Sequence, residues 1–179
     1  MTAARRPRSE PEPRYSLAEA LDILATSPGL IAAATAGLAA ADLHTPFEPD
    51  GWSARDILAH VRACHRTWGA YIERILDEDR PVFRAESPRS TIDQTDFLEQ
   101  RFKASLEDFT SDRDRLMARL RDVDERDFAR TATVTLPGLG QQSRSVRYYA
   151  DRMASHEREH VRHIEQASAS RRAPTTRAR

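Results

Sequence analysis

Apolar residues recur at helical spacing in four segments along the middle of the chain, about 16–41, 53–80, 93–123 and 145–167. Positions three and four residues apart lie on one face of a helix, so each segment predicts a helix with one apolar side. Four such helices bury their apolar sides by packing against one another. The pattern therefore predicts an all-α four-helix bundle.

Capping and turn residues mark several helix ends. Ser53 is a suitable N-cap, and Asp56 three residues later resembles the acid of a capping box. Trp52 and Ile57 then occupy the two positions of a hydrophobic staple. Proline cannot donate the hydrogen bond that a helix interior requires, so Ser27-Pro28-Gly29 predicts a break in the first helix.

The segment before the last helix has a different pattern. Residues 131–136 (Thr-Ala-Thr-Val-Thr-Leu) include types that favour strands, and Pro137-Gly138-Leu139-Gly140 is typical of a turn. We expect a short hairpin or extended segment there, followed by a helix with Ser145 as its N-cap.

Both ends of the chain are polar. Residues 1–14 and 168–179 are rich in Arg, Pro, Ser and Thr and poor in apolar side chains. Such segments bury too little apolar surface to fold, so they predict disordered tails around a single domain at residues 15–167.

Charge and cysteine content narrow the classes of function. The 28 basic and 28 acidic residues cancel, so no field of one sign attracts nucleic acid or an anionic membrane. We expect no membrane span, because no apolar run approaches the ~20 residues that one needs. The single cysteine, Cys64, forms no intrachain disulfide and fits a reducing compartment. We expect a cytoplasmic protein that binds neither nucleic acid nor membrane.

Two histidines of the last helical segment, His156 and His160, stand one helical turn apart. They share a face with apolar residues at helical spacing: Val146, Tyr149, Met153 and Ile164. Buried imidazoles need partners, and a divalent metal ion is a natural one. A metal site needs a third protein ligand, for which His60 is the best candidate, one turn before Cys64.

Other polar residues near these positions leave alternatives open. His163 shares the face and offers the pair His160 and His163, while His156 and His160 could also be ordinary core or surface histidines. Cys64 is either a fourth ligand or, as we favour, a small core residue.

Charged residues and one further histidine in the same helices have simpler interpretations. Arg113 either binds an anionic substrate group in a cavity or, as favoured, extends outward from the apolar stripe. His65 is predicted at a surface or interface. Glu157 and Glu159 are predicted to face solvent or to support the ligands from outside.

The sequence Gly51-Trp52-Ser53 followed by His60, together with His156-x-x-x-His160, resembles the DinB-like family, also called DinB/YfiT-like. The resemblance covers residues 15–167 and implies a four-helix bundle that is often dimeric. It implies that His60, His156 and His160 bind a divalent ion, most often zinc or nickel. Better-understood members use a low-molecular-weight thiol, bacillithiol or mycothiol, as the cosubstrate of an S-transferase, or mycothiol in an isomerase.

The resemblance thus leads us to expect a homodimeric, metal-dependent thiol S-transferase acting on a small-molecule substrate. A metal-dependent hydrolase would use the same site. No residue is assignable as a general base, so the catalytic residues stay unassigned. Because no acid–base partner accompanies the histidines, a second interpretation is open. It is a non-catalytic, metal-stabilised bundle that acts as a stress-related or partner-binding dimer.

Overall fold

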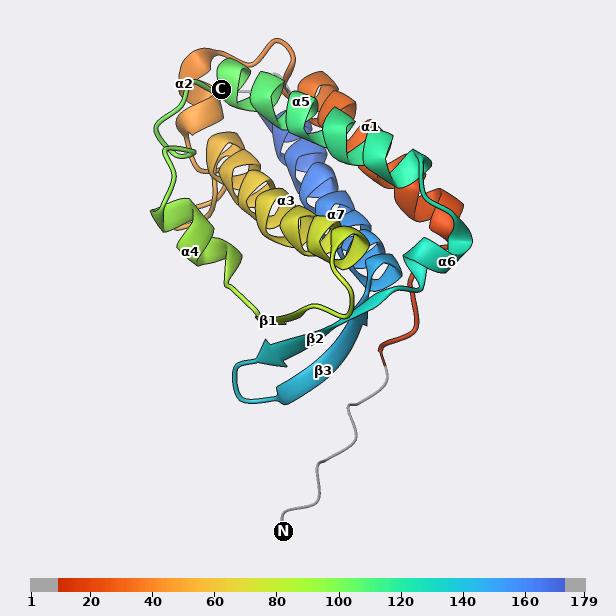
Figure 1. Ribbon diagram of the computed structural model, residues 1–179. Coiled ribbons are helices and arrows are strands. Elements are labelled where there is room, and N and C mark those ends of the chain that lie inside the picture. Colours follow the sequence, from red (N-terminus) through yellow and green to blue (C-terminus); the bar gives the residue numbers. More distant parts are fainter. Residues whose placement is uncertain (1–9, 173–179) are drawn as a thin grey trace, which may run out of the picture.

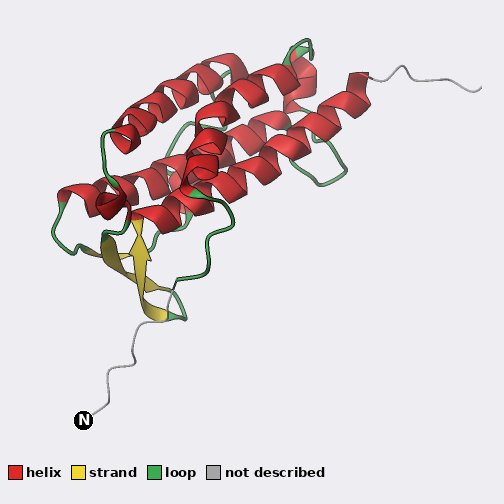
Figure 2. Ribbon diagram, turned by 90° about the vertical axis from the view of Figure 1, so that its right-hand side faces the viewer, coloured by secondary structure: helices red, strands yellow, loops and turns green. Residues whose placement is uncertain are grey.

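Four long helices form the body of the protein in a computed structural model that describes residues 10–172. Helices α1 (Leu17–Thr35), α3 (Ala54–Asp77), α5 (Phe102–Arg121) and α7 (Val146–Arg172) lie side by side (Figures 1 and 2). Three short helices lie in their connections: α2 (Ala40–His44), α4 (Pro88–Asp93) and α6 (Glu125–Phe128). The predicted all-α four-helix bundle is confirmed.

A small sheet covers one end of the bundle (Figure 2). Strands β2 (Thr131–Leu136) and β3 (Gly140–Ser145) are antiparallel, which confirms the predicted hairpin. Gly138 and Gly140 both have φ of +72°, a conformation that side-chain-bearing residues rarely adopt. A third strand, β1 (Val82–Arg84), pairs in parallel with β2 and was not predicted.

The apolar core consists of two main clusters that meet near the middle of α3 and α7. Along α3 most buried apolar residues up to Val61 belong to one cluster, and those from Cys64 onward belong to the other. Ala59 and Ala63 form a small third cluster with Phe97. Along α7 the same change occurs between Ala154 and Val161. His60, His156 and His160 stand at this change in both helices. The bundle therefore places polar side chains where the two clusters meet.

The predicted break at Ser27-Pro28-Gly29 is wrong, because α1 continues through Pro28 to Thr35. A proline leaves the carbonyl four residues earlier without its helical donor, which here is the carbonyl of Leu24. Arg113 on α5 donates a hydrogen bond from Nη1 to this oxygen, at 2.7 Å. A side chain from a distant segment thus satisfies the carbonyl that Pro28 leaves free.

Two other predicted boundaries also change. The third helix, expected at about 93–123, begins only at Phe102 as α5, and the short helix α4 lies before the expected segment. The last helix continues to Arg172, so residues 168–172 are helical and not part of a tail. Arg171 donates to the carbonyls of Thr45 and Pro46, which ties this end of α7 to the segment after α2.

Part of the expected N-terminal tail is ordered against α7. The Glu10 carboxylate accepts hydrogen bonds from the backbone N–H and hydroxyl of Ser145, the residue before α7. The Ser145 hydroxyl in turn accepts from Tyr148 N–H at 3.0 Å, as expected of an N-cap. The expected tails at residues 1–9 and 173–179 lie outside the described residues.

Helix α1 is apolar enough to pass a simple test for a membrane span. It has 19 residues and a mean hydropathy of 1.4, so the expectation that no segment approaches such a span is wrong for this helix. Within the structure α1 packs along α7 and α5, and core helices pass the same test. Length and composition alone therefore give α1 no membrane role.

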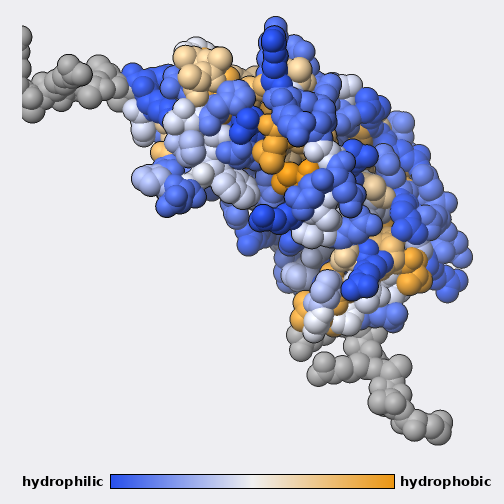
Figure 3. Space-filling model, turned by 90° about the vertical axis from the view of Figure 1, so that its left-hand side faces the viewer, coloured by the Kyte–Doolittle hydropathy of each residue, from blue (hydrophilic) through white to orange (hydrophobic). Residues whose placement is uncertain are grey.

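The face of the molecule that carries α2 and α4 is mostly hydrophilic, with hydrophobic residues in small patches (Figure 3). Two large apolar side chains in the segments after α2 and α4 are exposed: Trp52, with 43% of its surface accessible, and Leu98, with 40%. Trp52 belongs to the candidate site.

Candidate metal centre

The N-terminus of α3 is fixed by the predicted capping box. Ser53 Oγ accepts a hydrogen bond from Asp56 N–H at 3.2 Å, and Ser53 N–H donates to Asp56 Oδ2 at 2.9 Å. Two of the helix's free N–H groups are thereby satisfied. His60 follows one turn later, so the cap sets where its ring leaves α3.

The three histidines predicted as ligands come together between α3 and α7. His156 Nε2 lies 3.0 Å from His60 Nε2 and 3.3 Å from His160 Nε2. The ring centroids of His60 and His160 are 5.1 Å apart, so the three rings form one cluster.

The two Nε2 separations measured from His156 fit a divalent ion. At metal–nitrogen distances of about 2.0–2.1 Å, two ligands of a tetrahedral ion lie about 3.3–3.4 Å apart. A narrower angle at the ion shortens this separation, which accommodates the closer pair. Three nitrogen donors on two facing helices match the way bundle cores hold metals.

Burial keeps the three imidazoles neutral. The pKa of His156 is lowered to about 3 and that of His160 to about 4. Burial is the main cause of both shifts, and the neighbouring imidazoles contribute the smaller part. Burial also lowers the pKa of His60. Neutral imidazoles have a lone pair free for an ion, so the cluster is ready to bind metal at neutral pH.

Cys64 stands beside the cluster. Its side chain is 1% exposed, and its Sγ lies 3.6 Å from His60 Nε2 and 4.0 Å from His156 Nε2. Burial raises the pKa of this thiol to about 12. The favoured core position is thus correct. Cys64 also forms a group with His60 and His156 whose ligand atoms all lie within 4.8 Å of one another and could hold an ion. Among residues 10–172 this group does not include His160, which approaches the cluster through His156.

Tryptophan rings flank the cluster on two sides. Trp52 is parallel to the His160 ring at 5.8 Å and meets the edge of His60 at 4.9 Å. Trp68 meets the edge of His156 at 5.2 Å. His156 Nδ1 is buried and has no hydrogen-bond partner among residues 10–172, so packing against Trp68 orients this ring.

A buried ion pair lies behind the cluster. Arg113 and Glu157 are each 1% exposed, and Arg113 Nη1 donates to Glu157 Oε2 at 2.9 Å. Arg113 Nη2 also lies 3.2 Å from His65 Nδ1. Glu157 follows His156 on α7, and His65 follows Cys64 on α3. Arg113 therefore connects α7 and α3 on the side away from the cluster.

The structure decides between the alternatives for three of the predicted residues, and the favoured interpretation of Arg113 is wrong. Arg113 does not extend outward, because Glu157 and the Leu24 carbonyl bind its guanidinium in the interior. Glu157 does not face solvent, which leaves the other alternative, a position behind the ligands. His65 is buried between helices and not at a surface. Burial and the Arg113 cation lower the pKa of His65 to about 3.

The other alternative residues make contacts outside the three histidines. The His163 ring packs on Phe47 at 5.7 Å between centroids. Glu159 is exposed, as one of the two predicted alternatives had it, and pairs with Arg14 at 3.1 Å.

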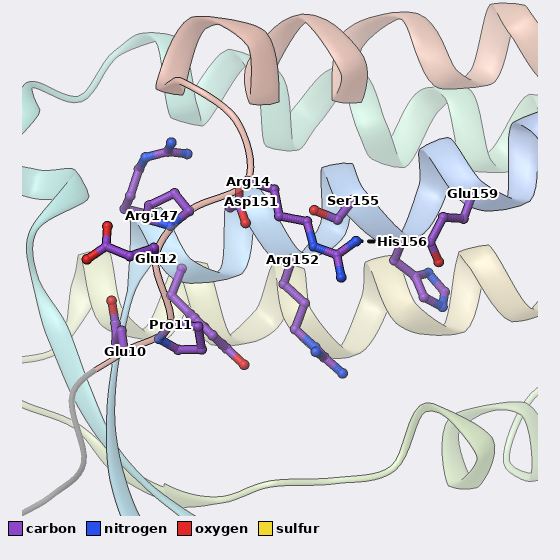
Figure 4. A pocket seen from close by; sticks show the side chains of 12 residues that line it. Glu10, Pro11, Glu12, Arg14, Arg147, Asp151, Arg152, Ser155, His156 and Glu159 are labelled. Carbon is purple, nitrogen blue, oxygen red and sulfur yellow. Dashed lines mark hydrogen bonds and ion pairs between the residues drawn. The ribbon is translucent and has the colours of Figure 1, made fainter.

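A pocket of about 440 Å³ reaches the cluster from one side. Residues 10–14 and the first half of α7 line it, and Figure 4 shows His156 and Glu159 at one end with Glu10 and Glu12 toward the other. Both charges are present, since the lining residues include Arg14, Arg147 and Arg152 as well as acids. The pocket would give a small molecule access to the His156 side of the cluster.

Comparison with protein families decides the relationship. The profile of the DinB superfamily matches residues 6–164, which is most of the chain. The chain belongs to the DinB superfamily. A comparison with curated proteins gave no match.

Among solved structures, this DinB superfamily protein is similar to YfiT from Bacillus subtilis. The two share 19% sequence identity with a TM-score of 0.75, over 91% of this chain and 93% of YfiT. YfiT is described as a probable metal-dependent hydrolase with an unusual four-helix bundle topology. At this identity the likeness supports the fold of this DinB superfamily member.

Sequence reasoning missed the part of the site that depends on long-range packing. The capped helix and histidine spacing indicated His60, His156 and His160. No local signal indicated that Trp68 would contact His156, or that residues 10–14 would line the pocket. Trp68 stands one helical turn after Cys64, so the sequence alone indicates only a core position for it.

Proposed function

We propose that this protein is a divalent-metal-dependent enzyme whose ion is bound by His60, His156 and His160. The observation that carries the proposal is the convergence of three neutral Nε2 atoms, at 3.0 and 3.3 Å, beside a pocket that reaches His156. The description of YfiT as a metal-dependent hydrolase supports it. Zinc and nickel are the ions we favour, because both bind imidazole well.

An ion held by three neutral ligands keeps its full positive charge and lowers the pKa of a small nucleophile that it binds. The nucleophile is either a low-molecular-weight thiol, as in an S-transferase, or water, as in a hydrolase. The resemblance of the histidine pattern favours the thiol, of the mycothiol or bacillithiol type, and the description of YfiT favours water.

The residues of the pocket have roles in binding the second reactant. Arg152 stands one helical turn before His156, and its guanidinium lies over the Trp68 ring at 4.8 Å. Within residues 10–172 it makes no ion pair, so its charge is available to an anionic group of a substrate. Contacts from Tyr15 N–H to Asp151, at 3.0 Å, and from Arg14 to Glu159 hold the N-terminal segment over the pocket.

The test is turnover by protein loaded with Zn²⁺ or Ni²⁺. An electrophilic substrate is offered with mycothiol, bacillithiol or a simple thiol, and an activated ester is offered without thiol. We expect turnover by the wild type that is lost in His156→Ala and retained in His163→Ala, a matched substitution on the same helix.

The cosubstrate dependence separates the three functions. Turnover only with a thiol identifies a transferase, and hydrolysis without a thiol identifies a hydrolase. Metal-loaded protein that turns over none of these substrates would favour the non-catalytic bundle.

A further inference from the structure

Cys64 is the feature of the site that the three-histidine pattern does not include. It stands four residues after His60 on α3, so its side chain leaves the same face of the helix one turn later. Its thiol is buried, and the polar atoms that it contacts within residues 10–172 are the Nε2 atoms of His60 and His156. A cysteine that served only to fill the core would not need to direct its sulfur at two nitrogen donors.

The distances decide what this placement means. With a metal–sulfur distance of about 2.3 Å and a metal–nitrogen distance of about 2.0–2.1 Å, tetrahedral ligands place sulfur and nitrogen about 3.5–3.6 Å apart. Cys64 Sγ lies 3.6 Å from His60 Nε2, and 4.0 Å from His156 Nε2 corresponds to a wider angle at the ion.

We propose that Cys64 is a fourth ligand, so that this site binds its ion through three imidazoles and one thiolate. The proposal rests on the proposed metal site and deepens it, because the fourth position is where a closed and an open site differ. On binding, the sulfur–hydrogen bond of Cys64 breaks, a sulfur–metal bond forms and the proton passes to solvent.

Two consequences follow for the site. A thiolate donor favours thiophilic ions such as zinc and cobalt over magnesium, calcium and manganese. Cys64 also adds one negative charge and occupies the position that a nucleophile needs. The ion therefore has three neutral ligands and its full charge only after a small molecule has displaced the thiolate. Ligand exchange at Cys64 would then control access to the ion.

Cobalt spectroscopy tests this directly, since Co²⁺ substitutes for zinc and shows its ligands by absorption. Metal-free protein is titrated with Co²⁺ in buffer without any thiol reductant. We expect visible ligand-field bands together with a near-ultraviolet charge-transfer band from thiolate to cobalt, both saturating at one ion per chain. Cys64 is the single cysteine of the chain, so a thiolate band has one source.

Variants supply the matched comparison. Cys64→Ser keeps the size of the side chain and should retain the visible bands, lose the near-ultraviolet band and bind Co²⁺ at least about tenfold more weakly. His163→Ala should retain both sets of bands. If Cys64→Ser does not fold, Cys64→Ala replaces it, and the wild-type spectrum alone still reports the thiolate.

The outcomes separate this proposal from the proposed function. Visible bands without a thiolate band in the wild type would overturn ligation by Cys64 and leave the three-histidine site in place. A near-ultraviolet band that persists in Cys64→Ser would overturn it too. Absence of bound Co²⁺ in the folded wild type, measured by elemental analysis after dialysis, would overturn the metal site itself.

Discussion

The chain holds two tryptophans, and both contact histidines of the cluster. Ions such as Ni²⁺ quench tryptophan fluorescence at short range, so we predict that Ni²⁺ lowers the intrinsic emission of the metal-free protein. His60→Ala should remove this response, and His44→Ala, which changes an exposed histidine of α2, should retain it. Fluorescence titration measures the effect, and quenching that is equal in all three proteins would contradict the site.

At the scale of single residues, the sequence predicted those contacts that depend on helical spacing. His156 and His160 meet because they are four residues apart on α7, and His60 was found through the capped start of α3. The partner of Glu157 could not be predicted in the same way. Arg113 lies 44 residues away on α5, and its contact depends on how the two helices pack.

Helix α1 shows how one element depends on another. Pro28 leaves the Leu24 carbonyl without a helical donor, and Arg113 on α5 supplies one while it also binds Glu157 on α7. The same guanidinium lies 3.2 Å from His65 Nδ1 on α3. One buried guanidinium therefore joins all four long helices.

We predict that Arg113→Met destabilises the protein by about 3–5 kcal/mol, because it leaves the Glu157 charge buried and unpaired. Urea denaturation measures the free energy of unfolding. The control Arg115→Met removes a largely exposed arginine of the same helix and should change this energy by no more than about 0.5 kcal/mol.

The double variant Arg113→Met/Glu157→Met tests whether the loss comes from the pair. With both charges absent, the double variant should lose much less stability than the sum of the two single variants. Additive losses would show that the two side chains contribute independently.

At the scale of elements, the sequence predicted helices but not all their boundaries. The apolar spacing predicted α3 and α7, and the turn at Pro137-Gly138 predicted the hairpin. The continuation of α1 through Pro28 was missed, because the compensating donor comes from α5. Strand β1 was missed because its three residues form a strand only by pairing with β2.

The stability of the whole molecule should depend on pH through its buried histidines. The folded-state pKa values of His65 and His156 are about 3 and that of His160 is about 4, whereas an unfolded chain titrates near 6.5. Between these values the unfolded state binds more protons, so stability is complete above about pH 6.5 and is lost as the pH falls toward about 4.

Thermal unfolding of metal-free protein from about pH 8 to about pH 5 measures this effect, since most carboxylates titrate at lower pH. We predict a midpoint that is steady near pH 8 and falls below about pH 6.5. His156→Gln should reduce the dependence, and His44→Ala should not. A midpoint that stays constant down to pH 5 would contradict neutral buried histidines.

The bundle architecture was predictable from the whole chain, because four amphipathic segments have few other ways to bury their apolar faces. The expected homodimer and cytoplasmic location are properties of the molecule in its surroundings, and both stay predictions. The pocket could not be predicted, because residues 10–14 read as a polar tail and line it only through contacts such as that of Glu10 with Ser145.

The central claim is that His60, His156 and His160 bind a divalent ion. Its most direct test is equilibrium dialysis of tag-free protein against Zn²⁺ or Ni²⁺, followed by elemental analysis of the wild type, His156→Ala and His163→Ala. We predict one ion per chain in the wild type and in His163→Ala, and none in folded His156→Ala. Full metal content in folded His156→Ala, or none in the wild type, would contradict the account.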